Sequence, residues 1–151
     1  MIRCFETHEL PKVDHVRLCG LLESAFGRLL APWYFDEKRI ICLYLDGDYR
    51  GVAILTSEGG CVPYLDKFAV APGTRGNGVA RELWERLKDK NPALYWRSRQ
   101  GNPINSWYRQ QANGSRQAQA WEVFWYGLTP SQANACFNRA LGIAPSFLDP
   151  P

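Results

Sequence analysis

Three glycines and an arginine occupy the junction between an expected strand and an expected helix. The stretch YLDKFAVAPGTRGNGVARELW, residues 64–84, begins with β-branched and aromatic residues and ends in a helical pattern. The N-terminus of a helix presents unpaired N–H groups and a partial positive charge, which attract anions. Glycine has no Cβ, so a phosphate can approach those N–H groups closely. The stretch therefore predicts a phosphate site, with an ordinary turn shaped by Pro72, Gly73 and Gly76 as the alternative.

Strand alternation divides YLDKFAV between two faces of the expected sheet. One face carries Leu65, Lys67 and Ala69, and the other carries Tyr64, Asp66, Phe68 and Val70. We therefore expect that Lys67 and Asp66 do not both face a substrate. A lysine charge in an apolar strand needs a ligand or a partner, so the alternative for Lys67 is an edge position or a buried ion pair.

Two arginines follow on the next expected strand. Arg97 and Arg99 are two residues apart in YWRSRQGN, so both guanidinium groups project from one face if the strand extends that far. Guanidinium binds carboxylate through two parallel hydrogen bonds. Together with Lys67, the arginines predict a pocket for a small dianionic compound. The alternatives are a solvated strand end and contacts with cofactor phosphates.

The hydrophobic pattern predicts that a mixed α/β fold positions these residues. Strands are expected at 2–8, 62–70, 93–98 and 121–128, and a hairpin at 39–56 around Asp46-Gly47-Asp48. Helices are expected from Pro11 to Ala25, Val79 to Leu87, Asn102 to Tyr108 and Thr129 to Leu141, with one further turn within 28–38. The expected parallel pair of strands lies within residues 64–98.

Composition restricts the function classes. With 46% hydrophobic and 22% charged residues, the chain is expected to form one globular domain over residues 1–151. No apolar run reaches the ~20 residues of a membrane helix, and the N-terminus lacks a signal-peptide core. The net charge of +3 is too small to indicate nucleic acid. Five widely spaced cysteines without a CxxC pair predict neither a disulfide framework nor a metal site.

The glycine-rich segment resembles the acyl-CoA loop of the Gcn5-related N-acetyltransferases (GNAT), whose pattern is (Q/R)-x-x-G-x-(G/A). Arg75, Gly78 and Ala80 match that pattern. No GK(S/T) follows for a Walker A loop, and the glycines do not fit the Rossmann fingerprint. The resemblance implies the GNAT fold, an α/β (α+β) domain with a mixed, mostly antiparallel sheet flanked by helices. Acyl-CoA would bind where its parallel strands splay apart.

In that family the loop N–H groups bind the CoA pyrophosphate, and the preceding strand offers its backbone to the pantetheine and the acetyl carbonyl. The resemblance therefore implies acetyl-CoA as a co-substrate and no metal. The positions implied for acetyl-CoA are Phe68, Ala69, Val70, Arg75, Gly76, Asn77, Gly78, Val79 and Ala80.

Three longer runs indicate a narrower family. YLDKF, YWRSRQGNPINSWY and WEVFWYGL are similar to the acetyltransferase domain of N-acetylglutamate synthase, in the vertebrate-like form that is also found fused to N-acetylglutamate kinase. The resemblance covers about residues 15–148. It implies transfer of acetyl from acetyl-CoA to the α-amine of L-glutamate, which gives N-acetyl-L-glutamate and CoA in arginine biosynthesis.

The same resemblance implies roles for individual residues. Glutamate-binding positions fall on Lys67, Arg97, Ser98, Arg99, Asn102 and Arg28. Tyr108 matches the tyrosine that protonates the CoA thiolate, with a packing role as the alternative. The general base is left unassigned among the titratable side chains Asp66, His15 and Glu23.

The family domain normally follows an amino-acid kinase domain, which residues 1–151 do not contain. We expect an excised or free-standing domain within a homo-oligomer, without nucleic-acid or membrane partners. Its expected location is the cytoplasm, or the mitochondrial matrix in a eukaryote. Competing interpretations are a GNAT enzyme for another small amine, a non-catalytic CoA or amino-acid sensor, and an RNA-binding module built on the arginines and aromatics of residues 95–116.

Overall fold

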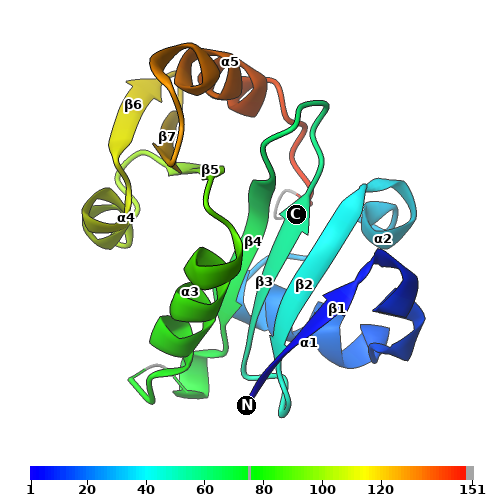
Figure 1. The fold of residues 1–151 in the computed structure, drawn as a ribbon. Helices are drawn as coiled ribbons and strands as arrows, with labels where there is room; N and C mark the ends of the chain where they lie inside the picture. Colours follow the sequence, from blue (N-terminus) through cyan, green and yellow to red (C-terminus); the bar gives the residue numbers. More distant parts are fainter. Residues whose placement is uncertain (75, 149–151) are drawn as a thin grey trace.

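Seven strands form one continuous sheet in the computed structural model, which describes residues 1–74 and 76–148 (Figure 1). The order across the sheet is β1-β2-β3-β4-β5-β7-β6. The strands are β1 (Ile2–Glu6), β2 (Ile40–Asp46), β3 (Gly51–Thr56), β4 (Tyr64–Val70), β5 (Leu94–Arg99), β6 (Gly114–Ala118) and β7 (Trp121–Tyr126). Neighbouring strands are antiparallel except β4 and β5, which run parallel. The predicted mixed, mostly antiparallel sheet is confirmed.

Helices cover both faces of this sheet. The α-helices are α1 (His15–Phe26), α2 (Tyr34–Glu37), α3 (Val79–Lys90), α4 (Asn105–Gln111) and α5 (Pro130–Leu141). Two 3-10 helices, η1 (Thr7–Lys12) and η2 (Pro72–Thr74), precede α1 and α3. In Figure 1, α3 lies on the near side of the sheet and α1 on the far side, while α4 and α5 lie beside its β5–β7–β6 end.

Local signals in the sequence set several boundaries. α1 begins after Asp14, whose carboxylate accepts hydrogen bonds from two N–H groups of the first turn, and ends at Gly27 in the left-handed conformation (φ 66°). α5 begins with a capping box formed by Thr129 and Gln132. The expected start of the first helix at Pro11 is wrong, because Pro11 belongs to the separate 3-10 helix η1.

Within residues 1–74 and 76–148, three apolar clusters hold the layers together. The first lies between the sheet and α3 and is rich in aromatic residues, among them Trp84 and Trp96. The second joins the β1–β4 half of the sheet to α1 through residues such as Leu18 and Leu22. The third packs α5 against β5 and β7 through Phe137. β4 contributes residues to all three clusters, so the path of this strand determines which side chains pack in each of them.

β4 contains a β-bulge. Its pairing with β3 passes from Leu55–Leu65 directly to Ile54–Lys67, so Asp66 is an extra residue on β4. A bulge interrupts the alternation of side chains, because two residues on one strand oppose one residue on its partner. The face that each later residue of β4 presents therefore differs from the face that regular alternation predicts.

β4 and β5 diverge along their length. In the described part of the chain their pairing is restricted to Tyr64 and Tyr95, near the N-terminal end of each strand. Beyond this point β4 keeps β3 as its neighbour and β5 keeps β7, while the two inner edges separate (Figure 1). The parallel pair is therefore splayed, as the resemblance implied, and the site lies between its strands.

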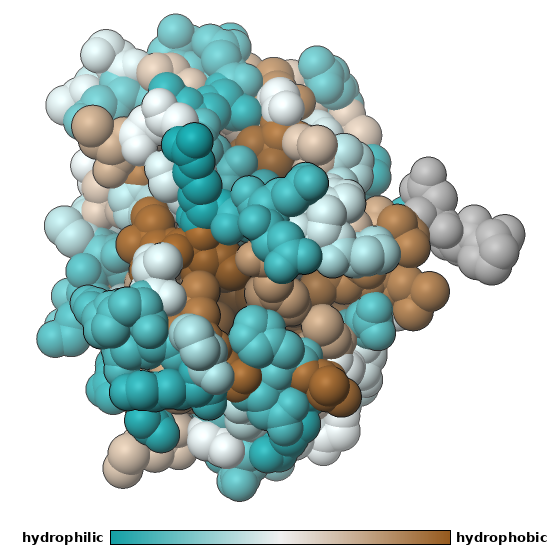
Figure 2. Space-filling view, turned by 90° about the vertical axis from the view of Figure 1, so that its right-hand side faces the viewer, coloured by the Kyte–Doolittle hydropathy of each residue, from teal (hydrophilic) through white to brown (hydrophobic). Residues whose placement is uncertain are grey.

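The surface is mixed in character. Hydrophilic side chains cover much of the face seen in Figure 2, and hydrophobic ones gather in a band across its middle. None of the helices within residues 1–74 and 76–148 combines the length and the apolar character needed to cross a membrane.

Candidate active site

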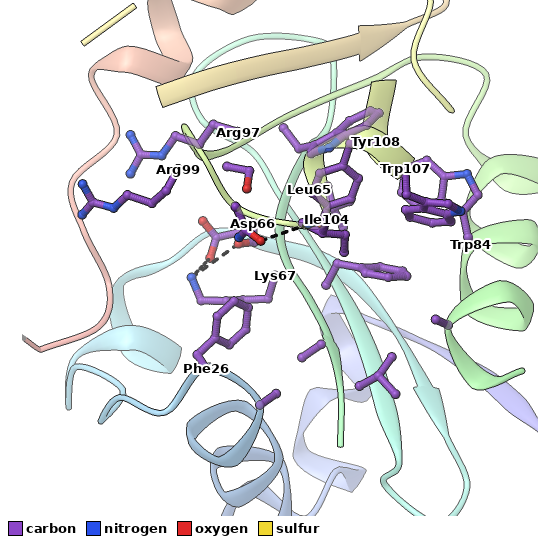
Figure 3. A pocket seen from close by; sticks show the side chains of 18 of the residues that line it. Phe26, Leu65, Asp66, Lys67, Trp84, Arg97, Arg99, Ile104, Trp107 and Tyr108 are labelled. Carbon is purple, nitrogen blue, oxygen red and sulfur yellow. Dashed lines mark hydrogen bonds and ion pairs between the residues drawn. The ribbon is translucent and has the colours of Figure 1, made fainter. Parts of the chain in front are cut away.

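The splayed strands β4 and β5 border a cleft with a volume of about 1170 Å³. The loop before α3, α4, the end of α1 and residues 144–147 complete its walls. Most predicted site residues line it, namely Arg28, Lys67, Phe68, Ala69, Val70, Gly76, Gly78, Ala80, Arg97, Ser98, Arg99, Asn102 and Tyr108. Figure 3 shows charged side chains of β4 and β5 on one side of the cleft, and aromatic side chains of α3 and α4 on the other.

Three predicted cofactor positions lie differently. The Val79 side chain is only 3% exposed and packs in the core cluster beneath α3. Asn77 is exposed and is not among the lining residues, and its N–H donates to the carbonyl of Thr74 (3.2 Å). Arg75 lies outside the described residues. Contacts of these three positions with acetyl-CoA stay predictions. For Val79 the prediction concerns the backbone, because the side chain is buried.

The loop before α3 exposes its backbone to the cleft. Gly76 and Gly78 have φ values of 95° and 78°, in the left-handed region that favours glycine. A Cβ added to either residue would have no atom within 4 Å, so the space beside the backbone is open. Gly78 is the N-cap of α3 and supplies no side-chain acceptor to the first turn. Such a helix end can receive a phosphate, because its N–H groups point outward unpaired.

The inner edge of β4 faces the cleft beside this loop. Residues 68–70 pair with β3 along the opposite edge. The ring of Phe68 stacks on Trp107 with 6.0 Å between centroids, and it meets Trp84 edge-on at 5.6 Å. The cleft therefore offers an extended ligand both a strand edge and an aromatic wall.

Tyr108 reaches the cleft from α4. It is 7% exposed and its ring contacts those of Trp84, Trp96 and Phe124. Burial in these surroundings raises the pKa of Tyr108 above its ordinary value. The phenol is thus protonated at neutral pH and can donate a hydrogen bond or a proton to a group in the cleft.

Asp66 and Lys67 both line the cleft, contrary to the expectation from strand alternation. The nitrogen Nζ of Lys67 lies 3.0 Å from Oδ2 of Asp66 and donates to Oγ of Ser146 (2.5 Å). The cause is the bulge at Asp66, which breaks the alternation. Phe68 consequently packs with the cluster that contains Leu65, whereas alternation had placed Leu65 with Lys67.

A buried polar network surrounds Asp66. Tyr34 donates to Oδ2 of Asp66 (2.6 Å), and Nζ of Lys38 lies 3.5 Å from Oδ1 and 3.2 Å from Glu58. Burial opposes ionisation of Asp66, but the charges of Lys67 and Lys38 and these hydrogen bonds hold its pKa below the ordinary value. Burial also opposes the charged form of Lys67 and so lowers the pKa of this residue, although the negative charge of Asp66 acts in the opposite direction. The carboxylate is therefore ionised and already occupied by donors.

Arg97 and Arg99 project from one face of β5, as predicted, and meet an aromatic ring. Their guanidinium carbons lie 3.8 and 4.4 Å from the ring centroid of Trp121 on β7. Arg97 also donates to the carbonyl of Ala140 (2.8 Å). Within residues 1–74 and 76–148, neither arginine forms an ion pair with a carboxylate.

The other residues that were predicted to bind glutamate also line the cleft. Ser98, on the same strand, is buried, and Asn102 accepts a hydrogen bond from the N–H of Ile104 (3.2 Å). Arg28, which follows α1, also lines the cleft. Of the three titratable candidates for the base, Asp66 lines the cleft, whereas His15 and Glu23 do not.

Sequence reasoning missed two parts of the wall. Trp121 was given no role in the site, yet it lines the cleft beside the arginines. Residues 144–147 were given no role, yet they line the cleft, and Phe147 bridges to Leu30. The alternation of side chains along the expected strand was the available signal for the face of Trp121, but its neighbours on β5 depend on strand register.

One group of possible metal ligands occurs in the described part of the chain. It consists of Glu6, His8 and Glu9, whose ligand atoms lie within 4.8 Å of one another. The three residues lie around η1 at the surface and do not line the cleft.

The architecture defines the class of protein. The crystal structure of a GNAT family acetyltransferase from Elizabethkingia anophelis, which has acetyl-CoA bound, matches with a TM-score of 0.59 at 12% sequence identity, covering 85% of this chain and 97% of that chain. The seven-stranded sheet with its splayed parallel pair is therefore the GNAT fold.

The sequence then places the chain more narrowly. It belongs to the family described as NAT, N-acetyltransferase, of N-acetylglutamate synthase, whose model matches residues 5–139. It is 40% identical over 121 residues to an acetylglutamate kinase from Xanthomonas campestris pv. campestris, covering 78% of this chain and 28% of that protein. It is 37% identical over 153 residues to the mitochondrial N-acetylglutamate synthase of Homo sapiens, covering 98% and 29%. The chain thus spans less than a third of the length of these curated relatives.

Proposed function

We propose that this chain transfers the acetyl group of acetyl-CoA to the α-amine of L-glutamate, giving N-acetyl-L-glutamate and CoA. The observation that carries the proposal is the pair Arg97 and Arg99, which lines the cleft without a carboxylate partner in the described residues. The other half of the same cleft contains the N-terminus of α3, which has no side-chain cap, and open space beside Gly76 and Gly78. Membership of the N-acetylglutamate synthase family supports the pairing of these two halves.

Acetyl-CoA would occupy the half between the α3 loop and α4. The N–H groups at the start of α3 would bind the pyrophosphate, with Gly76 and Gly78 giving it room. The inner edge of β4 at Phe68–Val70 would bind the pantetheine through backbone groups, against the aromatic wall. Acetyl-CoA bound to the Elizabethkingia anophelis protein of the same fold supports this assignment.

Glutamate would occupy the charged half. Its two carboxylates suit the guanidinium groups of Arg97 and Arg99, because each can form paired, charge-assisted hydrogen bonds. Arg28, Ser98 and Asn102 line the same half and would complete the contacts. Lys67 contributes positive charge, although its ammonium group already contacts Asp66 and Ser146. Its contribution to glutamate binding would therefore be smaller than that of the arginines, because Asp66 offsets its charge.

The reaction would be direct attack of the neutral amine on the thioester carbon. An N–C bond forms, the C–S bond breaks, and the thiolate leaves. Backbone N–H groups of β4 would polarise the thioester carbonyl, and binding would supply proximity and orientation. Tyr108 would donate its proton to the departing sulfur and would regain a proton from solvent. The amine would lose its proton to solvent, since the carboxylate of Asp66 is occupied by Lys67, Lys38 and Tyr34.

Thiol release from acetyl-CoA tests the proposal. We expect release that depends on L-glutamate and is much slower with aspartate, glutamine or spermidine. Glutamine keeps the length of glutamate and lacks the second carboxylate, so it isolates the contribution of that carboxylate to binding. Absence of glutamate-dependent thiol release from a sample with a cooperative unfolding transition would contradict the proposal. Equal rates with spermidine would favour a GNAT enzyme for another amine.

The relatives suggest a wider context. Since the chain corresponds to less than a third of the kinase and synthase relatives, we propose that it acts as the acetyltransferase domain of a longer synthase or synthase/kinase chain. A homo-oligomer and a location in the cytoplasm, or in the mitochondrial matrix of a eukaryote, belong to the same proposal. Size measurement of the purified protein tests the oligomer directly.

A further inference from the structure

Trp121, the first residue of β7, lines the acceptor half of the cleft. It lies on β7 directly opposite Arg99 of β5, and Arg97 is paired two residues further along, with Val123. The guanidinium carbons of both arginines lie within 4.4 Å of the Trp121 ring centroid. One indole therefore contacts both arginines of β5 that line this half.

Two like charges at neighbouring positions on one strand face repel each other, and each side chain gains entropy by moving into solvent. The face of an indole attracts a cation because its ring quadrupole is negative there. Arg97 has a second restraint in its hydrogen bond to the carbonyl of Ala140. Arg99 is exposed, and its contact with Trp121 is the interaction that holds its guanidinium group in the described structure.

We propose that Trp121 is a positioning residue that holds the guanidinium groups of Arg97 and Arg99 together at the acceptor end of the cleft. The indole fixes the spacing of the two groups before a ligand arrives. It thereby favours a small acceptor with two carboxylates over one with a single carboxylate. This preference rests on the proposed function, whereas the positioning of the arginines does not.

Kinetics of Trp121→Leu and Trp121→Phe provide the first test. Leucine removes the ring face, so the KM for glutamate should rise about tenfold, the size of effect expected for loss of cation–π contacts. The kcat and the KM for acetyl-CoA should stay within about twofold, because the reacting groups are untouched. Phenylalanine keeps a smaller ring face and should restore part of the affinity. The ratio of glutamate to glutamine activity should fall in the leucine variant.

Trp125→Leu is the matched control. Trp125 lies on the same face of the same strand, but its ring packs on Gly114 outside the cleft. It should leave the glutamate KM within about twofold. In an Arg99→Gln background, Trp121→Leu should raise the KM less than it does in the wild type, because it acts through the arginine. An unchanged glutamate KM in folded Trp121→Leu, or an equal rise in Trp125→Leu, would overturn the proposal.

A second readout needs no turnover. The ring current of Trp121 should shift the side-chain Nε–H resonances of Arg97 and Arg99 upfield in NMR spectra. Trp121→Leu should remove both shifts and Trp125→Leu should keep them. If the wild type releases no thiol with glutamate, the proposed function fails, and these resonances still decide the positioning role. Resonances at ordinary positions in the wild type would overturn it.

Discussion

The ammonium group of Lys67 lies 3.0 Å from the carboxylate of Asp66, and their side chains are only 6% and 5% exposed. Lys38 lies 3.5 Å from the other oxygen of Asp66. Asp66 therefore contacts two cations beside the cleft, and Glu58 is a second anion next to Lys38, so two carboxylates offset two ammonium groups. Removing one partner of such a set leaves an uncompensated buried charge, which is costly because the interior solvates it poorly.

We expect Asp66→Asn to lower the free energy of unfolding by about 3 kcal/mol, in line with breaking a buried ion pair. Urea titration at neutral pH measures this difference. The exposed Asp48 provides the control, and Asp48→Asn should change the free energy by less than about 0.5 kcal/mol. Equal stabilities of Asp66→Asn and Asp48→Asn would show that solvent reaches the cluster.

Arg97→Ala should raise the KM for glutamate by about 10- to 100-fold, the range expected for loss of charge-assisted hydrogen bonds. The KM for acetyl-CoA should change little if Arg97 binds the acceptor. Arg116→Ala is the comparison, because Arg116 also lies over an aromatic ring, that of Phe137, but outside this cleft. If both KM values rise together in Arg97→Ala, the arginine binds CoA phosphates instead.

Tyr108→Phe removes the proton donor proposed for the thiolate. We expect kcat to fall about 100-fold, as for loss of a general acid, with small changes in KM. Because burial raises the pKa of Tyr108, this residue should cause no loss of kcat between neutral pH and pH 10. Tyr126→Phe, which removes a hydroxyl bonded to the carbonyl of Asn91 away from the cleft, should keep full kcat. Full kcat in Tyr108→Phe would leave the tyrosine a packing role only.

Gly78→Ala would place a Cβ in the open space before α3, at a left-handed φ of 78°. We expect the KM for acetyl-CoA to rise about tenfold and the KM for glutamate to stay unchanged, since the methyl group would obstruct the phosphate side alone. Gly73→Ala also adds a Cβ in open space, but without the positive φ and outside the cleft lining. It should leave both KM values unchanged, and a matching rise there would indicate a general effect on the loop.

The pH dependence of stability should contain a contribution from Asp46. Its buried carboxylate accepts hydrogen bonds from Nε and Nη2 of Arg50 (2.8 and 2.9 Å), which hold the pKa of Asp46 far below its ordinary value. The folded pKa is thus lower than the unfolded pKa of about 3.9, so the contribution is complete above about pH 5 and is lost as pH falls. The stability difference between wild type and Asp46→Asn should therefore shrink from pH 5 to pH 2 in urea titrations. A difference independent of pH would contradict the assignment.

Local signals in the sequence predicted most of the elements and much of the cleft. The turn at Asp46-Gly47 and the capping residue Thr129 act over a few residues, so their effects are visible in the sequence itself. The i, i+2 spacing of Arg97 and Arg99 predicted a shared face because the β5 strand is regular. The family resemblance then correctly indicated a cleft between splayed parallel strands.

Contacts between distant parts of the chain determine the features of the fold and the cleft that were not predicted. The bulge at Asp66 arises from the register of β4 against β3, and Trp121 meets the arginines because β7 pairs with β5 in one particular register. Strand β6 was not expected, since GSRQA has little apolar character and is stabilised by pairing with β7. Ser146 contacts Lys67 across 79 positions of the sequence. None of these contacts has a local sequence signal.

The divergence of β4 from β5 leaves a strand edge along the cleft. A free edge can template the addition of a foreign strand, which is a common route to aggregation. On the function proposed above, acetyl-CoA lying along β4 would act as a removable strand and close this edge. The ligand would then protect the protein during storage and heating, in addition to serving as its substrate. The free energy of unfolding of the purified protein would rise with the logarithm of ligand concentration, as mass action requires.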